Sequence, residues 1–235
     1  MNKSLFALML CFQISFSQNT DHLNTVLKQL KIKKSEINLE LFTQKVLPYD
    51  KSKSVLVFPK YASEVSDDYF VADAYVLVID NATGKIQAKF IGHNAWTSDA
   101  VRLTAISIDT GLYLLNKTTR GFGVRVSFAN NSQPNPYREN SLSLYITDQN
   151  TLKQVLSNYT VSLYNGEWDT NCAGEFEESI STFNMDKLQN HNLNNIIVTT
   201  KIVKTKSKPV KDDCISKETI KKETSKLIFN GKEYK

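Results

Sequence analysis

Short runs of β-branched and aromatic residues, separated by turn sequences, recur along most of this 235-residue chain. In residues 121–128, large apolar residues alternate with glycine, arginine and serine, which is typical of a strand with one buried face. The segment Asp80–Gly84 places Asn and Gly between two such runs, as a tight hairpin requires. The pattern predicts a mainly β protein with an antiparallel sandwich or barrel-like fold. The expected strands cover residues 54–58, 70–79, 85–91, 102–109, 121–128, 141–147, 154–164, 178–185, 195–203 and 214–223, and a small hairpin ends the chain.

Two helical patterns precede the strands. Apolar residues recur at three- and four-residue spacing in Thr20–Leu30, which predicts a short N-terminal amphipathic helix with Thr20 as its N-cap. A weaker pattern over Glu36–Val46 predicts a second helical stretch that ends before Pro48.

The first 17 residues resemble a cleaved secretory signal. Lys3 gives a positive start, Leu5–Phe16 is mostly apolar, and Ser15 and Ser17 supply small residues before the cleavage point. We therefore expect a signal peptide at 1–17, an N-terminal helical segment at 18–48 and one β-rich domain at 49–235. The expected location is periplasmic or secreted. The alternative, a lipoprotein modified at Cys11, lacks the small residue that should precede the cysteine.

The positive charge of the chain is concentrated at its C-terminal end. Residues 18–200 carry 17 basic and 19 acidic side chains, whereas residues 201–235 carry 11 lysines and 5 acids. All four arginines lie upstream of this segment, so the composition does not favour nucleic-acid binding. Lys204, Lys206 and Lys208 alternate and share one face of an expected strand, where they either protect a sheet edge or contact acidic polymers. No later apolar run reaches the about 18 residues of a membrane helix, so we expect no integral membrane span.

Cys172 and Cys214 are the two cysteines that follow the signal. In an oxidising compartment they are expected to form one disulfide. A zinc site that also uses His191 is an alternative, but the spacing matches no familiar ligand pattern. We expect no metal and no cofactor.

Six residues are candidates for ligand binding. Trp96 and Trp168 lie in polar stretches that are expected to be loops. There they form either a stacking platform for a sugar or partner protein or caps on the core. Arg102 and Arg125 either pair with acids such as Asp99 and Asp109 or present a guanidinium fork to an anion. The remaining two candidates are Asp99, in the same polar stretch as Trp96, and Asp169, in the dense polar stretch 166–176.

The sequence contains no established catalytic motif. It lacks both a Gly-x-Ser-x-Gly elbow and a His-Glu-x-x-His helix, and His93 is the histidine best placed to act as a base. Glu167, Asp169 and Glu175 could supply the carboxylate pair of a glycoside hydrolase if their side chains flank a cleft. We therefore expect no catalytic residue, and keep a glycan-directed hydrolase as the alternative.

Several segments resemble, in the same order, a group of uncharacterised exported bacterial proteins to which no activity is assigned. They are residues 98–102, 108–110, 120–125, 135–137 and 166–176. The strand-rich second half and the terminal Phe-Asn-Gly-Lys-Glu-Tyr sequence are also similar, more loosely, to periplasmic lysozyme-inhibitor-like β domains. The resemblance implies an exported β-rich bacterial protein and transfers no functional residue.

Together these features predict a non-enzymatic binding protein of the bacterial cell envelope. Its expected partner is an envelope protein or a glycan, and its action could be that of an inhibitor. A structural envelope protein whose lysine-rich end contacts acidic polymers is a further alternative.

Overall fold

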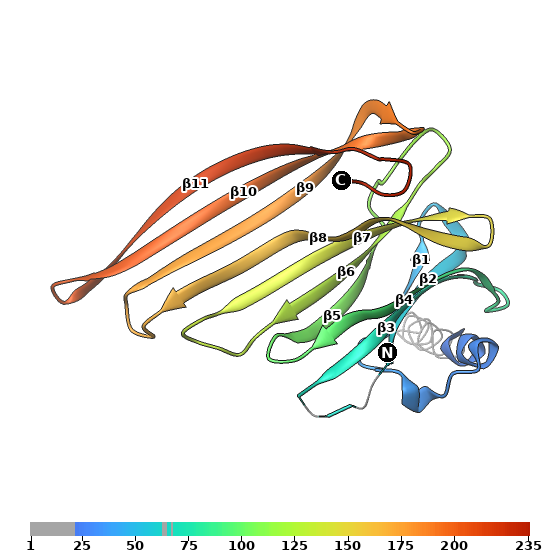
Figure 1. Cartoon of the computed structure of the whole chain (residues 1–235), viewed down its shortest axis with the longest axis horizontal. Helices are drawn as coiled ribbons and strands as arrows, with labels where there is room; N and C mark the ends of the chain where they lie inside the picture. Colours follow the sequence, from blue (N-terminus) through green and yellow to red (C-terminus); the bar gives the residue numbers. More distant parts are fainter. Residues whose placement is uncertain (1–21, 63–64, 67) are drawn as a thin grey trace, which may run out of the picture.

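The structure is a computed structural model that describes residues 22–62, 65–66 and 68–235. Eleven strands join into one sheet in this part of the chain (Figure 1). The expected signal peptide, Cys11 and the Thr20 cap lie outside the described residues. The strands are β1 (Thr43–Leu47), β2 (Asp50–Tyr61), β3 (Phe70–Asp80), β4 (Ile86–Ser98), β5 (Arg102–Asp109), β6 (Phe122–Ala129), β7 (Tyr137–Asp148), β8 (Thr151–Trp168), β9 (Gly174–Asn190), β10 (Leu193–Val210) and β11 (Asp213–Leu227).

The sheet is a nearly closed barrel with a long extension. Its strand order is β1-β2-β3-β4-β8-β7-β6-β5, and β5 packs against β1, β2 and β4. Among the described strands, the pairings are antiparallel except one parallel bridge between Lys89 of β4 and Thr151 of β8. The expected mainly β, barrel-like fold is therefore confirmed. Alternating apolar residues of the strands fill the barrel interior, and Val55, Val76 and Val124 are almost completely buried there.

Strand β8 is where the sheet divides. Strand β7 pairs with one edge of β8. Along the other edge, the first residue of β8 pairs with β4 and the last seven residues pair with β9. Between these two segments of β8 lies the C-terminal tail of the chain. The Tyr234 amide there donates a hydrogen bond to the Val155 carbonyl of β8 at 2.7 Å. A second core forms here, in which Leu144 of β7, Ile196 of β10 and the ring of Tyr234 are buried.

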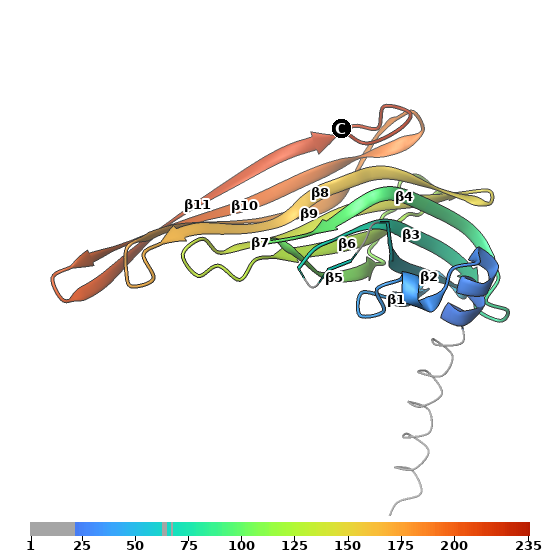
Figure 2. The same cartoon turned by 60° about the horizontal axis from the view of Figure 1, so that its bottom comes forward.

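Strands β9–β11 continue beyond this second core as an arm, the upper left part of Figure 1. Every residue of β11 from Asp213 to Lys226 is exposed. Figure 2 shows that the arm extends away from the end of the sheet that carries β1–β4. A ladder without a buried face is stabilised mainly by its backbone hydrogen bonds and by any cross-link it contains.

The N-terminal helix, residues 22–30, packs on the outer face of the barrel. Leu23, Val26 and Leu27 contact a buried cluster that includes Leu56 of β2 and Leu77 of β3. The expected amphipathic helix is confirmed over the described residues. Among these residues no helix is long and apolar enough to cross a membrane.

The second helical prediction, over Glu36–Val46, is wrong. A short 3-10 helix spans Lys34–Glu36, and strand β1 follows it. Residues Thr43–Val46 of β1 pair with Ser54–Val57 of β2. Formation of this sheet edge overrides a weak local pattern, because long-range pairing satisfies more backbone groups than one isolated helical turn.

Candidate functional site: an aromatic surface at the base of the arm

The structure places Trp96 in the barrel core. Strand β4 continues from Ile86 to Ser98, so the polar stretch around His93 is strand and not loop. Trp96 is only 5% exposed and packs among the interior side chains, which makes it a core residue. Of the two tryptophans, Trp168 alone is accessible, so the stacking platform that would use both residues does not form.

Asp99 and Arg102 lie at the end of the barrel, near the β4–β5 turn. The Asp99 carboxylate accepts a hydrogen bond from the Val101 amide at 2.9 Å and thereby shapes the turn. The Arg102 guanidinium contacts the Asp68 carboxylate at 2.8 Å, and both side chains are largely exposed. Their local contacts account for both residues without a ligand.

Arg125 belongs to a separate polar network outside the barrel. Its Nε donates to Asp109 at 2.7 Å, and one Nη donates to the Asn140 side-chain oxygen at 3.2 Å. Asp109 also accepts hydrogen bonds from the Tyr113 hydroxyl and the Gly111 amide. Burial raises the pKa of Asp109, but the hydrogen bonds and the Arg125 charge outweigh burial and hold that pKa below its ordinary value. The sequence-level alternative of pairing between Arg125 and Asp109 is confirmed.

Trp168 lies at the end of β8 among other aromatic side chains that sequence reasoning did not select. The aromatic surface consists of Arg138, Tyr164, Trp168 and Phe176, from β7, β8 and β9. The Arg138 guanidinium lies over the Tyr164 ring, 4.6 Å from its centroid. The Tyr164 and Phe176 rings are stacked, with their centroids 6.1 Å apart and an interplanar angle of 12°. These side chains border an open groove of about 660 Å³.

Two glycines allow the rings to lie flat against the sheet. Gly166 is the cross-strand partner of Phe176, and Gly174 is the partner of Trp168. A Cβ atom on Gly166 would overlap the Phe176 ring, and one on Gly174 would lie 3.0 Å from the Trp168 ring. Larger residues would therefore push both rings off the strands. Because residues two apart on a strand share a face, Tyr164, Gly166 and Trp168 all face this surface.

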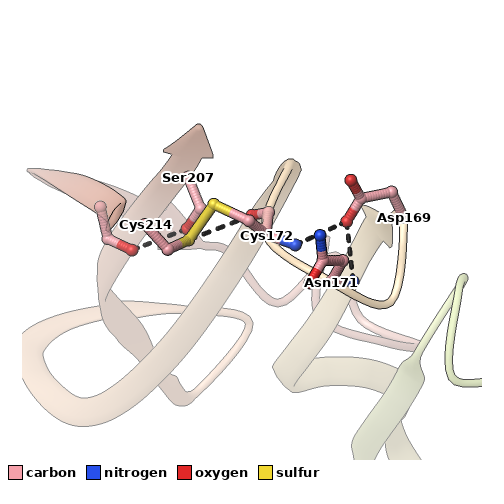
Figure 3. Close-up of a disulfide and its surroundings, with 6 residues drawn as sticks. Asp169, Asn171, Cys172, Ser207 and Cys214 are labelled. Carbon is pink, nitrogen blue, oxygen red and sulfur yellow. Dashed lines mark hydrogen bonds between the residues drawn. A yellow bond between two sulfur atoms is a disulfide. The ribbon is translucent and has the colours of Figure 1, made fainter. Parts of the chain in front are cut away.

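The disulfide links the loop beside the aromatic surface to the arm. The sulfur atoms of Cys172 and Cys214 are bonded, which joins the β8–β9 loop to the start of β11 (Figure 3). In the loop, the Asp169 carboxylate accepts hydrogen bonds from the amides of Asn171 and Cys172 at 2.9 and 2.8 Å. These backbone hydrogen bonds hold the pKa of Asp169 below its ordinary value. Asp169 therefore shapes the loop that carries Cys172.

The three acids of the hydrolase alternative line one groove, and two of them are poorly suited to proton donation. Glu167 and Glu175 are cross-strand partners, and both line a groove beside Trp168 and Asp169. A glycosidase needs one carboxyl group with a raised pKa as its general acid. The Lys206 ammonium contacts Glu175 and lowers the pKa of Glu175, as the loop amides lower that of Asp169. Neither of these two carboxyl groups is suited to act as the acid at neutral pH.

The other histidines and lysines considered from the sequence have local contacts within the protein. The His93 ring is largely exposed and contacts Asp73 at 3.3 Å. His191 contacts the Phe229 carbonyl, and the described residues contain no cluster of three or more side chains suited to a metal. Lys204 pairs with Glu177 at 2.7 Å on the same ladder where Lys206 meets Glu175.

Sequence reasoning found Trp168 but missed Arg138, Tyr164 and Phe176. The available signal was the alternation of Tyr, Gly and Trp at 164, 166 and 168, followed by Gly174 and Phe176 after a short turn. A strand that alternates aromatics with glycine indicates rings lying on a sheet face. Comparison of this chain with protein-family models, curated proteins and solved structures gives no match.

Proposed function

We propose that this chain is an exported, non-enzymatic glycan-binding protein whose binding site is the aromatic surface. One observation carries the proposal: Tyr164, Trp168 and Phe176 lie partly exposed on adjacent strands around one groove, where two glycines leave room for the rings. The face of an aromatic ring carries partial negative charge, which attracts the polarised C–H bonds of a pyranose ring. A row of such rings therefore suits a carbohydrate chain.

The polar groups around the rings suit the hydroxyl groups of a sugar. Arg138, Asn171, Ser207 and Gln133 border the same groove and offer both donors and acceptors. The disulfide fixes the loop that carries Asn171, which lowers the entropy cost of binding. The disulfide and the expected signal peptide support export, in line with the resemblance to exported bacterial proteins.

The two tryptophans provide a direct assay. Trp96 is buried in the barrel and Trp168 lines the groove, so a ligand on the aromatic surface changes the fluorescence of Trp168 alone. We expect soluble peptidoglycan fragments or other envelope oligosaccharides, first screened on a glycan array, to give a saturable change. Trp96→Phe should preserve the signal, whereas Trp168→Phe should abolish it.

Tyr164→Ala and Phe176→Ala test the binding itself, measured by calorimetry. Loss of a stacking ring should weaken binding about fivefold or more. Binding that is unchanged in both variants would contradict the proposal, as would a silent array together with silent titrations. Capture of an envelope protein that depends on Trp168, with no glycan bound, would instead favour protein recognition by the same surface.

A further inference from the structure

A second cavity lies at the mouth of the barrel, apart from the aromatic surface. It forms where the β1–β2 turn, the start of β4 and the β7–β8 turn meet, and its volume is about 910 Å³. Its floor contains Leu47, Val78 and Ala88, which are buried members of the barrel core. Barrel mouths are common ligand sites because they combine an apolar floor with polar turns.

The rim of this mouth is strongly positive. Lys53, Lys85, Lys89 and Arg120 line it, against one carboxylate from Asp50. That carboxylate is already paired with Lys53 at 2.7 Å. Within the part of the chain that the structure describes, the other three cations have no ion-pair partner. Close cations raise one another's energy, and an anionic ligand would relieve this repulsion.

Arg120 is the most informative of these cations. Its guanidinium lies over the Tyr49 ring, 4.2 Å from the centroid, and this stacking holds the side chain across the mouth. Its Nε is buried, and among the described residues no acceptor receives its hydrogen. The two Nη atoms of the same guanidinium carry four further N–H donors, and these donors can meet an anionic ligand in the mouth.

We propose that the barrel mouth binds a small organic anion, which has an apolar or aromatic body and a phosphate or carboxylate group. The body lies on Leu47, Val78 and the Tyr49 ring. The anionic group accepts hydrogen bonds from the Arg120 Nη atoms and lies near Lys89. An inorganic anion would leave the apolar floor uncovered, and a neutral apolar molecule would leave the cations unpaired.

Calorimetry with three probes tests this proposal. 1-Naphthyl phosphate carries both features, whereas inorganic phosphate and 1-naphthol carry one each. We expect saturable binding of naphthyl phosphate, and binding of the other two at least about tenfold weaker, because each lacks one set of contacts. Equal binding of inorganic phosphate, equal binding of naphthol, or no binding of naphthyl phosphate would overturn the proposal.

Variants locate the site. Arg120→Gln should weaken naphthyl phosphate binding about tenfold, since a hydrogen bond to a charged group is lost. Lys89→Gln, at an exposed side chain that leaves the fold intact, should weaken binding about two- to fivefold. Lys221→Gln on the arm changes the charge equally and should have no effect. Wild-type affinity in both mouth variants would overturn the proposal, and so would loss of binding in Trp168→Ala, which would place the probe on the aromatic surface.

Discussion

Removal of the disulfide should destabilise the protein by a predictable amount and in a predictable place. The two cysteines are 42 residues apart in sequence. A cross-link that closes a loop of this length removes about 4 kcal/mol of chain entropy from the unfolded state. The loop includes the whole of β9 and β10, and β10 carries the buried Ile196 and Val198. Unfolding of the second core therefore releases the whole loop.

Loss of the disulfide also affects the native state, and this effect makes the destabilisation smaller than about 4 kcal/mol. Residues 201–226 have no buried side chain, so without the cross-link the end of the arm can open while both cores stay folded. Opening adds entropy to the native state and offsets part of the loss. We therefore expect Cys172→Ala/Cys214→Ala to lower the free energy of unfolding by about 2–4 kcal/mol, with 4 as the upper limit.

Urea denaturation of the variant and of oxidised wild type measures this loss, and hydrogen exchange locates it. The backbone amides near Lys206 and Lys217 should lose protection from hydrogen exchange. The amide of Val124 in the barrel should remain more strongly protected than these arm amides. Reduction of wild type should reproduce the loss, and reductant should not affect the variant. A loss below about 1 kcal/mol, or an equal rise in exchange across barrel and arm, would refute the reasoning.

Three further predictions follow from the cores, the polar network and the glycines. Ile196→Ala should lower the free energy of unfolding by about 2–5 kcal/mol because Ile196 is fully buried, whereas Ile220→Ala, at a side chain that is 62% exposed, should change it by less than about 0.5 kcal/mol; urea denaturation compares the two. Asp109 has a lower pKa in the folded state than in the unfolded state. Its contribution to the free energy of unfolding is therefore present above its ordinary pKa of 3.8 and is lost as the pH falls through the pKa of the folded state. Asp109→Asn should therefore be less stable than wild type at pH 7, and the gap should narrow below pH 3.8; a gap independent of pH would contradict this assignment. Gly166→Val should displace the Phe176 ring and abolish oligosaccharide binding while thermal unfolding of the barrel stays near wild type; unchanged binding would show that the flat ring is unnecessary.

The strands were predictable where local pattern and tertiary position agree. Residues 102–109 were expected to be a strand and form β5 with the same bounds, because their alternation matches their burial. The long ladder of β9–β11 was expected to be shorter, since its exposed ends carry no apolar period. The polar stretch at His93–Ser98 looked like a loop, yet strand pairing with β3 carries it into the sheet.

The candidate site was only partly predictable, for a physical reason. Asp99 and Asp169 were selected for their chemistry, but both cap turns in their own loops. The aromatic surface depends instead on register, because Arg138 meets Tyr164, and Gly166 meets Phe176, only through strand pairing. Pairing across distant strands depends on long-range contacts that a local pattern does not contain. The disulfide was predictable from sequence because the expected removal of Cys11 with the signal peptide leaves two cysteines to pair.

Strand β8 links the two proposed sites as a rigid spacer. Its first residue follows Gln149 and Asn150, which line the barrel mouth, and its last residue is Trp168 of the aromatic surface. A fully extended strand of 18 residues spans at most about 60 Å, and the irregular pairing of β8 with β7 shortens this distance. Two ligands bound at opposite ends of β8 would be held at this fixed separation without contact. If both proposals hold, the chain would act as a bivalent adaptor that holds a small organic anion at one point and a glycan chain at another.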